Sequence, residues 1–292
     1  MNFAGCYTAL VTPFGADGQI DLARLRQHIE FQAAGGVAGV VPCGTTGESP
    51  TLSDGEWERI IAASVETARP LGLTVIAGTG SNSTHHAVEL QKRAAALGAN
   101  AGLSVNPYYN KPGQEGLRRH FLAVADAADL PVMLYNIPGR TGVALAPETI
   151  ARLAEHPNIA AVKEATGSMD SASAIASLCD ITILSGDDSM TLPFASVGGK
   201  GVVSVISNIL PQKVQHLCDA CNGGQWDRAR ELHLQLFDVC RSLLSLETNP
   251  IPIKTAMRLL GRDLGTLRLP MTEGSEATVA AIRTLLTRLK ML

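Results

Sequence analysis

Lys163 interrupts the apolar run NIAAVKE, residues 158–164, which otherwise predicts a buried strand. Desolvating an ammonium group is costly, so a buried lysine is rare unless it is paired or takes part in chemistry. Side chains alternate along a strand, and Lys163 therefore shares a face with Ala161. Inside a pocket, desolvation favours the neutral amine, a nucleophile that forms a Schiff base with a carbonyl. The alternative is an ammonium group that extends along the surface to solvent.

Three more apolar runs end in residues that suit the same chemistry. Thr45 and Thr46 lie between glycines in PCGTTGES, where hydroxyls and closely approaching backbone amides suit a carboxylate or a proton relay. In YNIPGRTG, Tyr135 lies at a strand tip, and the guanidinium of Arg140 is shaped to bind a carboxylate through two hydrogen bonds. The loop NPYYNKP at 106–112 adds two adjacent tyrosines. Taken singly, these residues also suit a helix-capping turn, a solvated arginine and packing tyrosines.

Together these residues predict an aldolase that forms a Schiff base with a 2-oxo acid, in which the iminium accepts electrons and no metal is needed. Asp187 and Asp188 resemble a metal-binding pair, but acidic residues also favour a helix start after the seventh apolar run. Adjacent His85 and His86 point to different helix faces and make a poor shared ligand set. The GGKG at 198–201 lacks the spacing of a phosphate loop, and neither HExxH nor GxSxG occurs.

The elements that must position these residues alternate regularly. Eight short apolar runs, rich in Val, Ile and Ala, alternate with segments whose apolar residues recur at helical spacing. A period of about thirty residues is that of βαβ units, so eight units predict a parallel, closed (β/α)8 barrel. Its active site would lie at the carboxyl ends of the strands, where the polar residues above fall. A doubly wound open sheet is the alternative, but no GxGxxG follows the first run. The runs begin at residues 5, 37, 73, 100, 130, 158, 180 and 200.

From about Gly224 the alternation ends and only helical patterns follow. We therefore expect a catalytic barrel over residues 1–223 and a small helical domain over residues 224–292. The helical patterns cover 225–247, 250–261 and 275–292.

The charge of the chain is balanced, with 24 basic and 27 acidic residues, a net charge of −3 and no block of like charges. We therefore expect no nucleic-acid partner. No apolar run approaches the roughly 18 residues needed to cross a bilayer, and no basic leader precedes an apolar core, so we expect a cytoplasmic protein without membrane contact. Six cysteines are too sparse for a disulfide scaffold. We interpret Cys218 and Cys221, which form a CxxC, as structural thiols, and Cys43 as a packed one.

Seven motifs occur in order across almost the whole chain, namely GTTGE, PYYNKP, YNIPGRTG, VKEATG, SGDD, GGKGVVSV and NPIPIK. They closely resemble the dihydrodipicolinate synthase family of the Schiff-base pyruvate aldolases. The resemblance implies a lyase that condenses pyruvate with L-aspartate 4-semialdehyde in lysine and diaminopimelate biosynthesis. It also implies no cofactor, and a homotetramer built as a dimer of dimers.

By motif, the resemblance assigns the Schiff base to Lys163 and proton transfer to Tyr135. Thr45 and Tyr109 would complete a proton relay, with Tyr109 reaching in from the adjacent subunit of a tight dimer. Arg140 would bind the carboxylate of the semialdehyde. The substrate-binding residues that the resemblance implies are Thr46, Arg140, Val203 and Gly186.

The second interpretation of the sequence is that the chain is a related lyase with another substrate. N-acetylneuraminate lyase and the aldolases for 2-keto-3-deoxygluconate and 4-hydroxy-2-oxoglutarate look similar in strand order, tyrosine and lysine. They usually lack the arginine at this turn and the paired threonines, both of which this chain has. Two other classes are a catalytically silent barrel that binds a 2-oxo acid and a metal-dependent aldolase.

The resemblance also concerns feedback inhibition by lysine. Many members bind lysine at the dimer interface, where sensitive bacterial forms carry a glutamate at the position of His86 and histidines at those of Asp54 and Trp57. A neutral imidazole supplies no carboxylate to pair with the ammonium of a ligand. We therefore expect weak or absent inhibition by lysine. The matching positions are Ser49, Pro50, Asp54, Trp57, Asn82, His86 and Tyr108.

Overall fold

The structure is a computed structural model that describes residues 3–263 and 265–292. Within these residues, eight parallel strands close into a barrel, with β8 hydrogen-bonded to β1. The predicted (β/α)8 barrel is confirmed, and each strand lies inside one of the predicted apolar runs. The strands are β1 (Gly5–Ala9), β2 (Gly39–Val41), β3 (Thr74–Gly78), β4 (Ala101–Val105), β5 (Val132–Asn136), β6 (Ile159–Glu164), β7 (Thr182–Ser185) and β8 (Gly201–Ser204).

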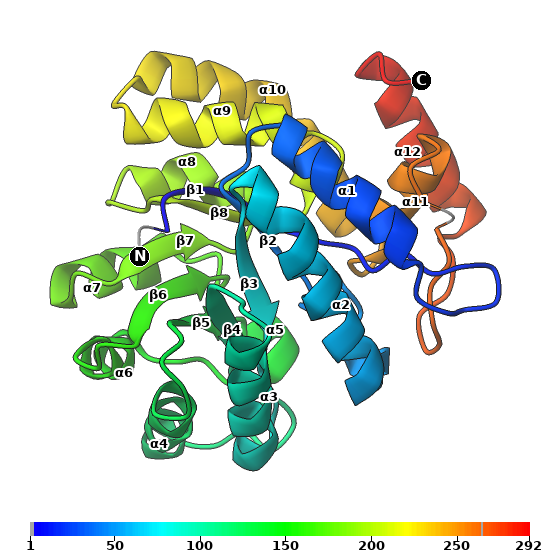
Figure 1. Cartoon of the computed structure of the whole chain (residues 1–292). Coiled ribbons are helices and arrows are strands. Elements are labelled where there is room, and N and C mark those ends of the chain that lie inside the picture. Colours follow the sequence, from blue (N-terminus) through cyan, green and yellow to red (C-terminus); the bar gives the residue numbers. More distant parts are fainter. Residues whose placement is uncertain (1–2, 264) are drawn as a thin grey trace.

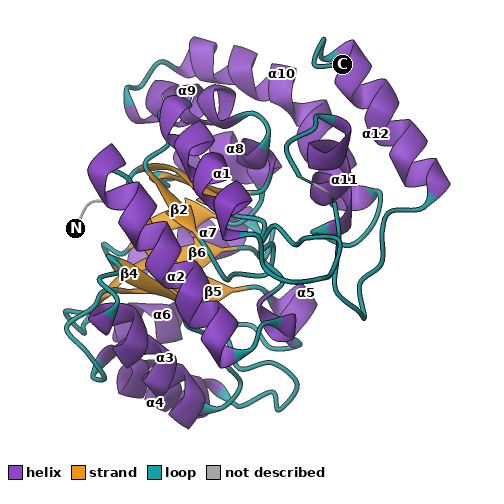
Figure 2. Cartoon of the chain, turned by 45° about the vertical axis from the view of Figure 1, so that its right-hand side comes forward, coloured by secondary structure: helices purple, strands orange, loops and turns teal. Residues whose placement is uncertain are grey.

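Helices surround the strands, which lie at the centre of the barrel part (Figure 2). Several begin at capping side chains, as at α2, where Ser53 and Glu56 form a capping box. The helices are α1 (Leu22–Ala34), α2 (Asp54–Ala68), α3 (Thr84–Ala96), α4 (Gln114–Ala125), α5 (Pro138–Thr141), α6 (Pro147–Ala154), α7 (Met169–Leu178), α8 (Thr191–Ala195), α9 (Pro211–Asn222), α10 (Trp226–Ser245), α11 (Ile251–Leu259) and α12 (Glu276–Arg288). Short 3-10 helices are η1 (Ser49–Thr51), η2 (Arg69–Leu71), η3 (Asp188–Met190) and η4 (Ile206–Asn208).

Two buried layers follow from the parallel sheet, because its strands are covered on both faces. One layer fills the lumen, and the other packs between the barrel and the helices. Closure of the barrel depends on Gly201, since a Cβ there would collide with the carbonyl oxygen of Gly5 on β1. The lumen cluster consists of Phe3, Tyr7, Ala9, Val41, Ile76, Ala101, Leu103, Met133, Tyr135, Ala161, Leu184 and Val203.

The last three α-helices lie against one side of the barrel (Figure 1). Helix α10 packs along α9, while α11 packs on α12. Leu236 on α10 and Ile253 on α11 belong to the same hydrophobic cluster as Val202 on β8. The C-terminal helices thus share a continuous core with the barrel, and the boundary that we predicted after residue 223 stays a prediction.

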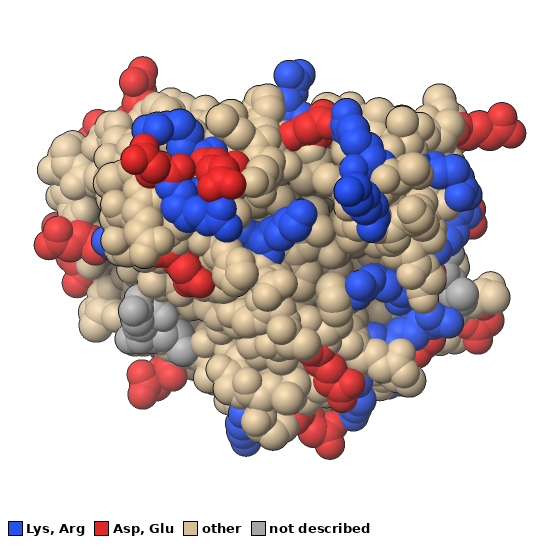
Figure 3. Space-filling view, turned by 90° about the horizontal axis from the view of Figure 1, so that it is seen from above, with Lys and Arg blue, Asp and Glu red and all other residues tan. Residues whose placement is uncertain are grey.

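The surface carries charges of both signs. On the face seen in Figure 3, lysines and arginines are interspersed with aspartates and glutamates over a largely uncharged surface. No helix in the described part of the chain is long and apolar enough to span a membrane. All six cysteines fall within the described residues and are unbridged.

Candidate active site

Tyr135 on β5 and Lys163 on β6 lie side by side in the barrel lumen. The two residues are in register between the strands, and the Nζ of Lys163 lies 3.9 Å from the ring centroid of Tyr135. Each residue is 5% exposed, and Ala161, which shares the face of Lys163, belongs to the lumen cluster. Lys163 therefore points into the lumen near the carboxyl end of its strand, and not outward to solvent.

A buried polar network on the other face of β5 and β6 holds these strands in register. Asn136 and Glu164, each the residue after a lumen side chain, are paired between the strands and fully buried. The Nδ2 of Asn136 donates to Oε2 of Glu164 at 2.9 Å, and its Oδ1 accepts the N–H of Leu145 at 2.9 Å. Burial raises the pKa of the Glu164 carboxyl. The network fixes the relative height of the lumen side chains and ties the loop after β5 to the barrel.

Gly186 and Val203 lie at the ends of β7 and β8. The N–H of Gly186 donates to the carbonyl oxygen of Glu164 at 2.8 Å, and a Cβ on Gly186 would lie 2.5 Å from that of Ala165. The strand end therefore requires glycine. Val203 is fully buried in the lumen cluster. Burial raises the pKa of the nearby Asp187 carboxyl, and the charge of Lys163 opposes this rise, so the two side chains are close enough to interact.

The acidic pair after β7 lies at a helix start, as one of its two interpretations predicted. The short helix η3 does begin at Asp188, but Asp187 makes no capping hydrogen bond to it. The carboxylate of Asp188 reaches the loop after β8, where it accepts the Ser204 hydroxyl at 2.5 Å. It also accepts the N–H groups of Val205 at 2.9 Å and Ile206 at 3.2 Å. Asp188 thus caps η4, and three hydrogen bonds satisfy its buried carboxylate.

Thr45 and Thr46 form the middle of a tight turn after β2, which we call the threonine turn (residues 44–47). The N–H of Gly47 donates to the carbonyl oxygen of Gly44 at 3.1 Å across it. The buried hydroxyl of Thr46 accepts a hydrogen bond from Nδ2 of Asn249 at 3.0 Å. Thr45 is half-buried and lines a cavity.

Arg140 lies on α5, directly after the strand that carries Tyr135. Its side chain is exposed, and Nη2 donates to the carbonyl oxygen of Asn249 at 3.1 Å. Asn249, just before α11, therefore contacts both Arg140 and Thr46, two of the predicted substrate-binding residues.

Tyr109 projects into solvent from the loop after β4. It is 89% exposed, with φ 72°, a left-handed conformation that is uncommon for a residue other than glycine. It does not line the cavity beside Thr45 in its own chain.

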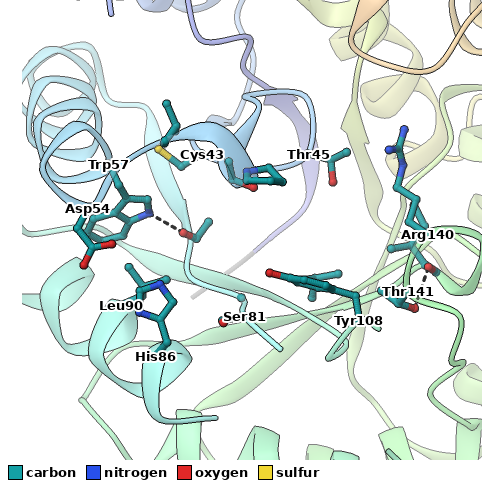
Figure 4. Close-up of a pocket in the computed structure, with 17 residues that line it drawn as sticks. Cys43, Thr45, Asp54, Trp57, Ser81, His86, Leu90, Tyr108, Arg140 and Thr141 are labelled. Atoms are coloured by element: carbon teal, nitrogen blue, oxygen red, sulfur yellow. Dashed lines mark hydrogen bonds between the residues drawn. The ribbon is translucent and has the colours of Figure 1, made fainter. Parts of the chain in front are cut away.

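A cavity of about 410 Å³ opens beside the threonine turn (Figure 4). Arg140 and Thr141 lie at one end and Trp57, Asp54 and His86 at the other. Every predicted lysine-binding residue except Asn82 lines the cavity. The carbonyl oxygen of Asn82 accepts a hydrogen bond from Nδ2 of Asn110 at 2.9 Å. The lining residues are Cys43, Thr45, Ser49, Pro50, Leu52, Asp54, Trp57, Gly78, Gly80, Ser81, His86, Leu90, Val105, Tyr108, Ile137, Arg140 and Thr141.

Polar groups at the far end of this cavity already have partners. The carboxylate of Asp54 accepts a hydrogen bond from Arg93 at 3.0 Å, and the indole N–H of Trp57 donates to the carbonyl oxygen of Gly78 at 2.8 Å.

Burial raises the pKa of the Cys43 thiol, which is therefore held neutral, in line with a packed cysteine.

Four residues that support the site were not singled out from the sequence, namely Glu48, Asn136, Glu164 and Lys254. Glu48 ends GTTGE, Glu164 follows the lysine of VKEATG, and Lys254 ends NPIPIK. For the three charged residues, the available signal was an ionisable side chain inside an otherwise apolar or glycine-rich motif, since such residues are buried only with partners.

A closed barrel with a lysine and a tyrosine side by side at the carboxyl ends of its strands is the arrangement expected of a TIM-barrel aldolase that acts through a lysine. The dihydrodipicolinate synthetase family model matches residues 2–289, and the chain belongs to this family of lyases.

Individual relatives are similar to this chain over nearly its full length. The 4-hydroxy-tetrahydrodipicolinate synthase of Citrifermentans bemidjiense is 50% identical over 292 residues, which cover 99% of this chain and 100% of that relative. The solved dihydrodipicolinate synthase from Aquifex aeolicus is 44% identical with a TM-score of 0.96 and covers 99% of each chain. The structure of the Cyanidioschyzon merolae enzyme with lysine bound is 40% identical, with the same TM-score and 99% coverage of each chain.

Proposed function

We propose that this chain condenses pyruvate with L-aspartate 4-semialdehyde to give 4-hydroxy-tetrahydrodipicolinate, the reaction for which its relatives are named. The observation that carries the proposal is the buried contact of 3.9 Å between the Lys163 amine and the Tyr135 ring in the lumen. A buried lysine beside a potential proton donor is suited to Schiff-base chemistry. The product belongs to the biosynthesis of diaminopimelate and lysine.

In the first half-reaction, the amine of Lys163 attacks C2 of pyruvate. Loss of water gives an iminium, and removal of a proton from C3 gives an enamine, with the iminium nitrogen accepting the electron pair. The hydroxyl of Thr46 and the backbone of Val203 hold the carboxylate of pyruvate, while Gly186 leaves room for it. Tyr135 donates and accepts the protons that water loss requires.

In the second half-reaction, the enamine carbon attacks the aldehyde carbon of the semialdehyde. Arg140 binds the carboxylate of this substrate, a role that its planar guanidinium suits. The amino group of the semialdehyde then attacks C2 and displaces Lys163, which closes the ring and restores the free amine.

Protons reach the site through Thr45 and through Tyr109 of the partner subunit. Tyr109 is exposed in its own chain and held in a left-handed conformation, which suits a residue that projects across an interface. We propose a homotetramer, a dimer of dimers, in the cytoplasm.

Borohydride reduction in the presence of pyruvate tests this function. We expect a reduced pyruvate adduct on the peptide that carries Lys163, located by mass mapping, and none without pyruvate. Lys163→Arg should abolish the adduct, whereas Lys200→Arg, at an exposed lysine, should not. Wild-type protein that forms no adduct while folded would contradict the Schiff-base mechanism.

Turnover then separates the remaining classes. Product formed from pyruvate and the semialdehyde excludes a silent barrel, and activity that persists with a chelator excludes a metal-dependent aldolase. An adduct without turnover of this semialdehyde would favour the related lyases that use other acceptor aldehydes.

A further inference from the structure

A buried ion pair joins the threonine turn to the C-terminal helices. The side chains of Lys254 on α11 and Glu48, directly after the turn, are 0% and 2% exposed. The Nζ of Lys254 donates to Oε1 of Glu48 at 2.7 Å and to the carbonyl oxygen of Thr266 at 2.7 Å. The other carboxylate oxygen, Oε2, accepts the backbone N–H of Arg268 at 3.1 Å. Both oxygens of Glu48 are therefore bonded to the C-terminal part of the chain.

Stability alone does not explain this pair. Moving two charges out of water is expensive, and a well-packed apolar pair of the same volume is often at least as stable. Burial lowers the pKa of Lys254, and the adjacent Glu48 carboxylate opposes that change. What a buried pair supplies is fixed geometry, because its hydrogen bonds are directional and each charge requires its partner.

The backbone that the pair reaches is strained. Glu48 has φ 55°, and Cys43 on the other side of the turn has φ 56°. Residues other than glycine keep this left-handed conformation only where surrounding contacts hold them. Thr45 and Thr46 lie between these two positions, so a relaxation at Glu48 would move their hydroxyls.

A second contact links the same C-terminal segment to the site. Asn249, just before α11, donates from its side chain to the hydroxyl of Thr46 at 3.0 Å and accepts from Arg140 at its carbonyl oxygen at 3.1 Å. The segment therefore contacts Thr46 within the threonine turn and Glu48 directly after it. We call the residues that make these contacts, Asn249, Lys254 and Arg268, the C-terminal brace.

We propose that Glu48 and Lys254 are positioning residues that dock the C-terminal brace on the threonine turn and so orient Thr45 and Thr46 toward pyruvate. The two residues act through the turn and do not touch the substrate. This inference rests on the proposed function, because it assumes that the threonines serve the keto acid.

The test uses Glu48→Gln, Lys254→Met and the double variant. The readout is the pyruvate concentration that gives half-maximal borohydride trapping on Lys163, together with the thermal midpoint of unfolding. We expect each single variant to lose thermal stability and to need at least tenfold more pyruvate. The double variant removes both buried charges, so it should regain stability but not pyruvate affinity. Arg258→Met is the matched control, because it removes an exposed ion pair with Glu273 from the same helix.

The outcomes separate the two proposals. Half-maximal trapping that stays at the wild-type pyruvate concentration in the folded double variant would overturn the positioning role and leave a merely structural pair. If the single variants fail to fold, the double variant alone decides. Absence of trapping in the wild type would contradict the proposed function instead.

Discussion

At the scale of single residues, Tyr135 offers two distinct groups beside Lys163, its ring and its hydroxyl. The ring of Tyr135 packs on the lysine at 3.9 Å, and its hydroxyl is the group that can move protons. A phenylalanine would keep the packing and remove only the hydroxyl.

We therefore expect Tyr135→Phe to lower kcat by about 10²–10³-fold, as the loss of a general acid and base does, with a much smaller change in KM for pyruvate. Steady-state kinetics with both substrates measure this. Tyr7→Phe is the control, since Tyr7 lies in the same lumen cluster but its hydroxyl contacts Thr74 at the start of β3. A similar loss of kcat in both variants would contradict proton transfer by Tyr135.

The cavity beside the threonine turn gives a second prediction at this scale. Asp54 is already paired with Arg93, and His86 offers an imidazole where a ligand ammonium needs a carboxylate. We expect no half-inhibition by sub-millimolar lysine in a steady-state assay, and we expect His86→Glu to introduce inhibition. Potent inhibition of the wild type would show that other groups in the cavity bind lysine.

At the scale of elements, Arg268 connects the C-terminal segment to α2 and to the loop before α1. Figure 1 shows these distant parts of the chain side by side. The guanidinium donates to Glu56 at 2.5 Å and to the carbonyl oxygen of Gly18 at 2.8 Å. Hydrogen bonds from Arg268 are the largest cause that lowers the pKa of Glu56 from 4.5 to about 2.

This shift makes stability depend on pH. The folded-state pKa of Glu56 lies below the unfolded value, so its stabilising effect is present above pH 4.5 and is lost as the pH falls to about 2. Because solvent screens this pair near the surface, the effect at neutral pH is of order 1 kcal/mol. We expect Arg268→Gln to lower the free energy of unfolding at pH 7, and we expect its difference from the wild type to narrow as the pH falls to about 2, where only the bonds to backbone carbonyls remain. Urea unfolding across this range measures the difference.

The comparison also controls for other acid-sensitive groups. Burial lowers the pKa of His28 and His120 to about 4, so protonation of either destabilises the fold below pH 6.5 in wild type and variant alike. Arg230→Gln, which removes an exposed pair with Asp227, should leave the profile unchanged. A constant difference between Arg268→Gln and wild type at every pH would exclude Glu56 as the source.

The sequence predicted local features better than distant pairings. Apolar runs located every strand, because parallel strands are buried on both faces. Alternation predicted that Lys163 shares a face with Ala161, but only the structure shows that this face is the lumen. The capping of η4 by Asp188 and the pairing of Glu48 with Lys254, 206 residues away, had no local pattern. Such contacts depend on which loops the closed barrel brings together, and only the tertiary structure provides that.

At the scale of the whole molecule, Tyr109 bears on assembly. If it serves the site of the neighbouring subunit, two inactive variants should complement each other. In a mixed dimer of Lys163→Ala and Tyr109→Phe, one site holds an intact Lys163 together with Tyr109 of the partner subunit. We expect an equal mixture, after subunit exchange, to recover about a quarter of wild-type activity, since half of the dimers are mixed and half of their sites are intact.

Activity assays of the two variants alone and mixed, with light scattering to follow the tetramer, measure this. In the matched control, Lys163→Ala is mixed with Tyr108→Phe, which changes the adjacent position in the same loop, and not with Tyr109→Phe. Mixtures that remain as inactive as their components would show that Tyr109 serves its own chain.

The C-terminal brace has a consequence for how the enzyme is made. Glu48 and Lys254 are 206 residues apart, and strands β3 to β8 are translated between them. At synthesis rates of about 5–20 residues per second, roughly 10–40 s pass between the two. During this interval the strained turn lacks the contacts that hold it, even where the strands have begun to pair. If the brace orients the threonines as proposed, a nascent chain gains the ability to bind the keto acid only after Arg268 has left the ribosome.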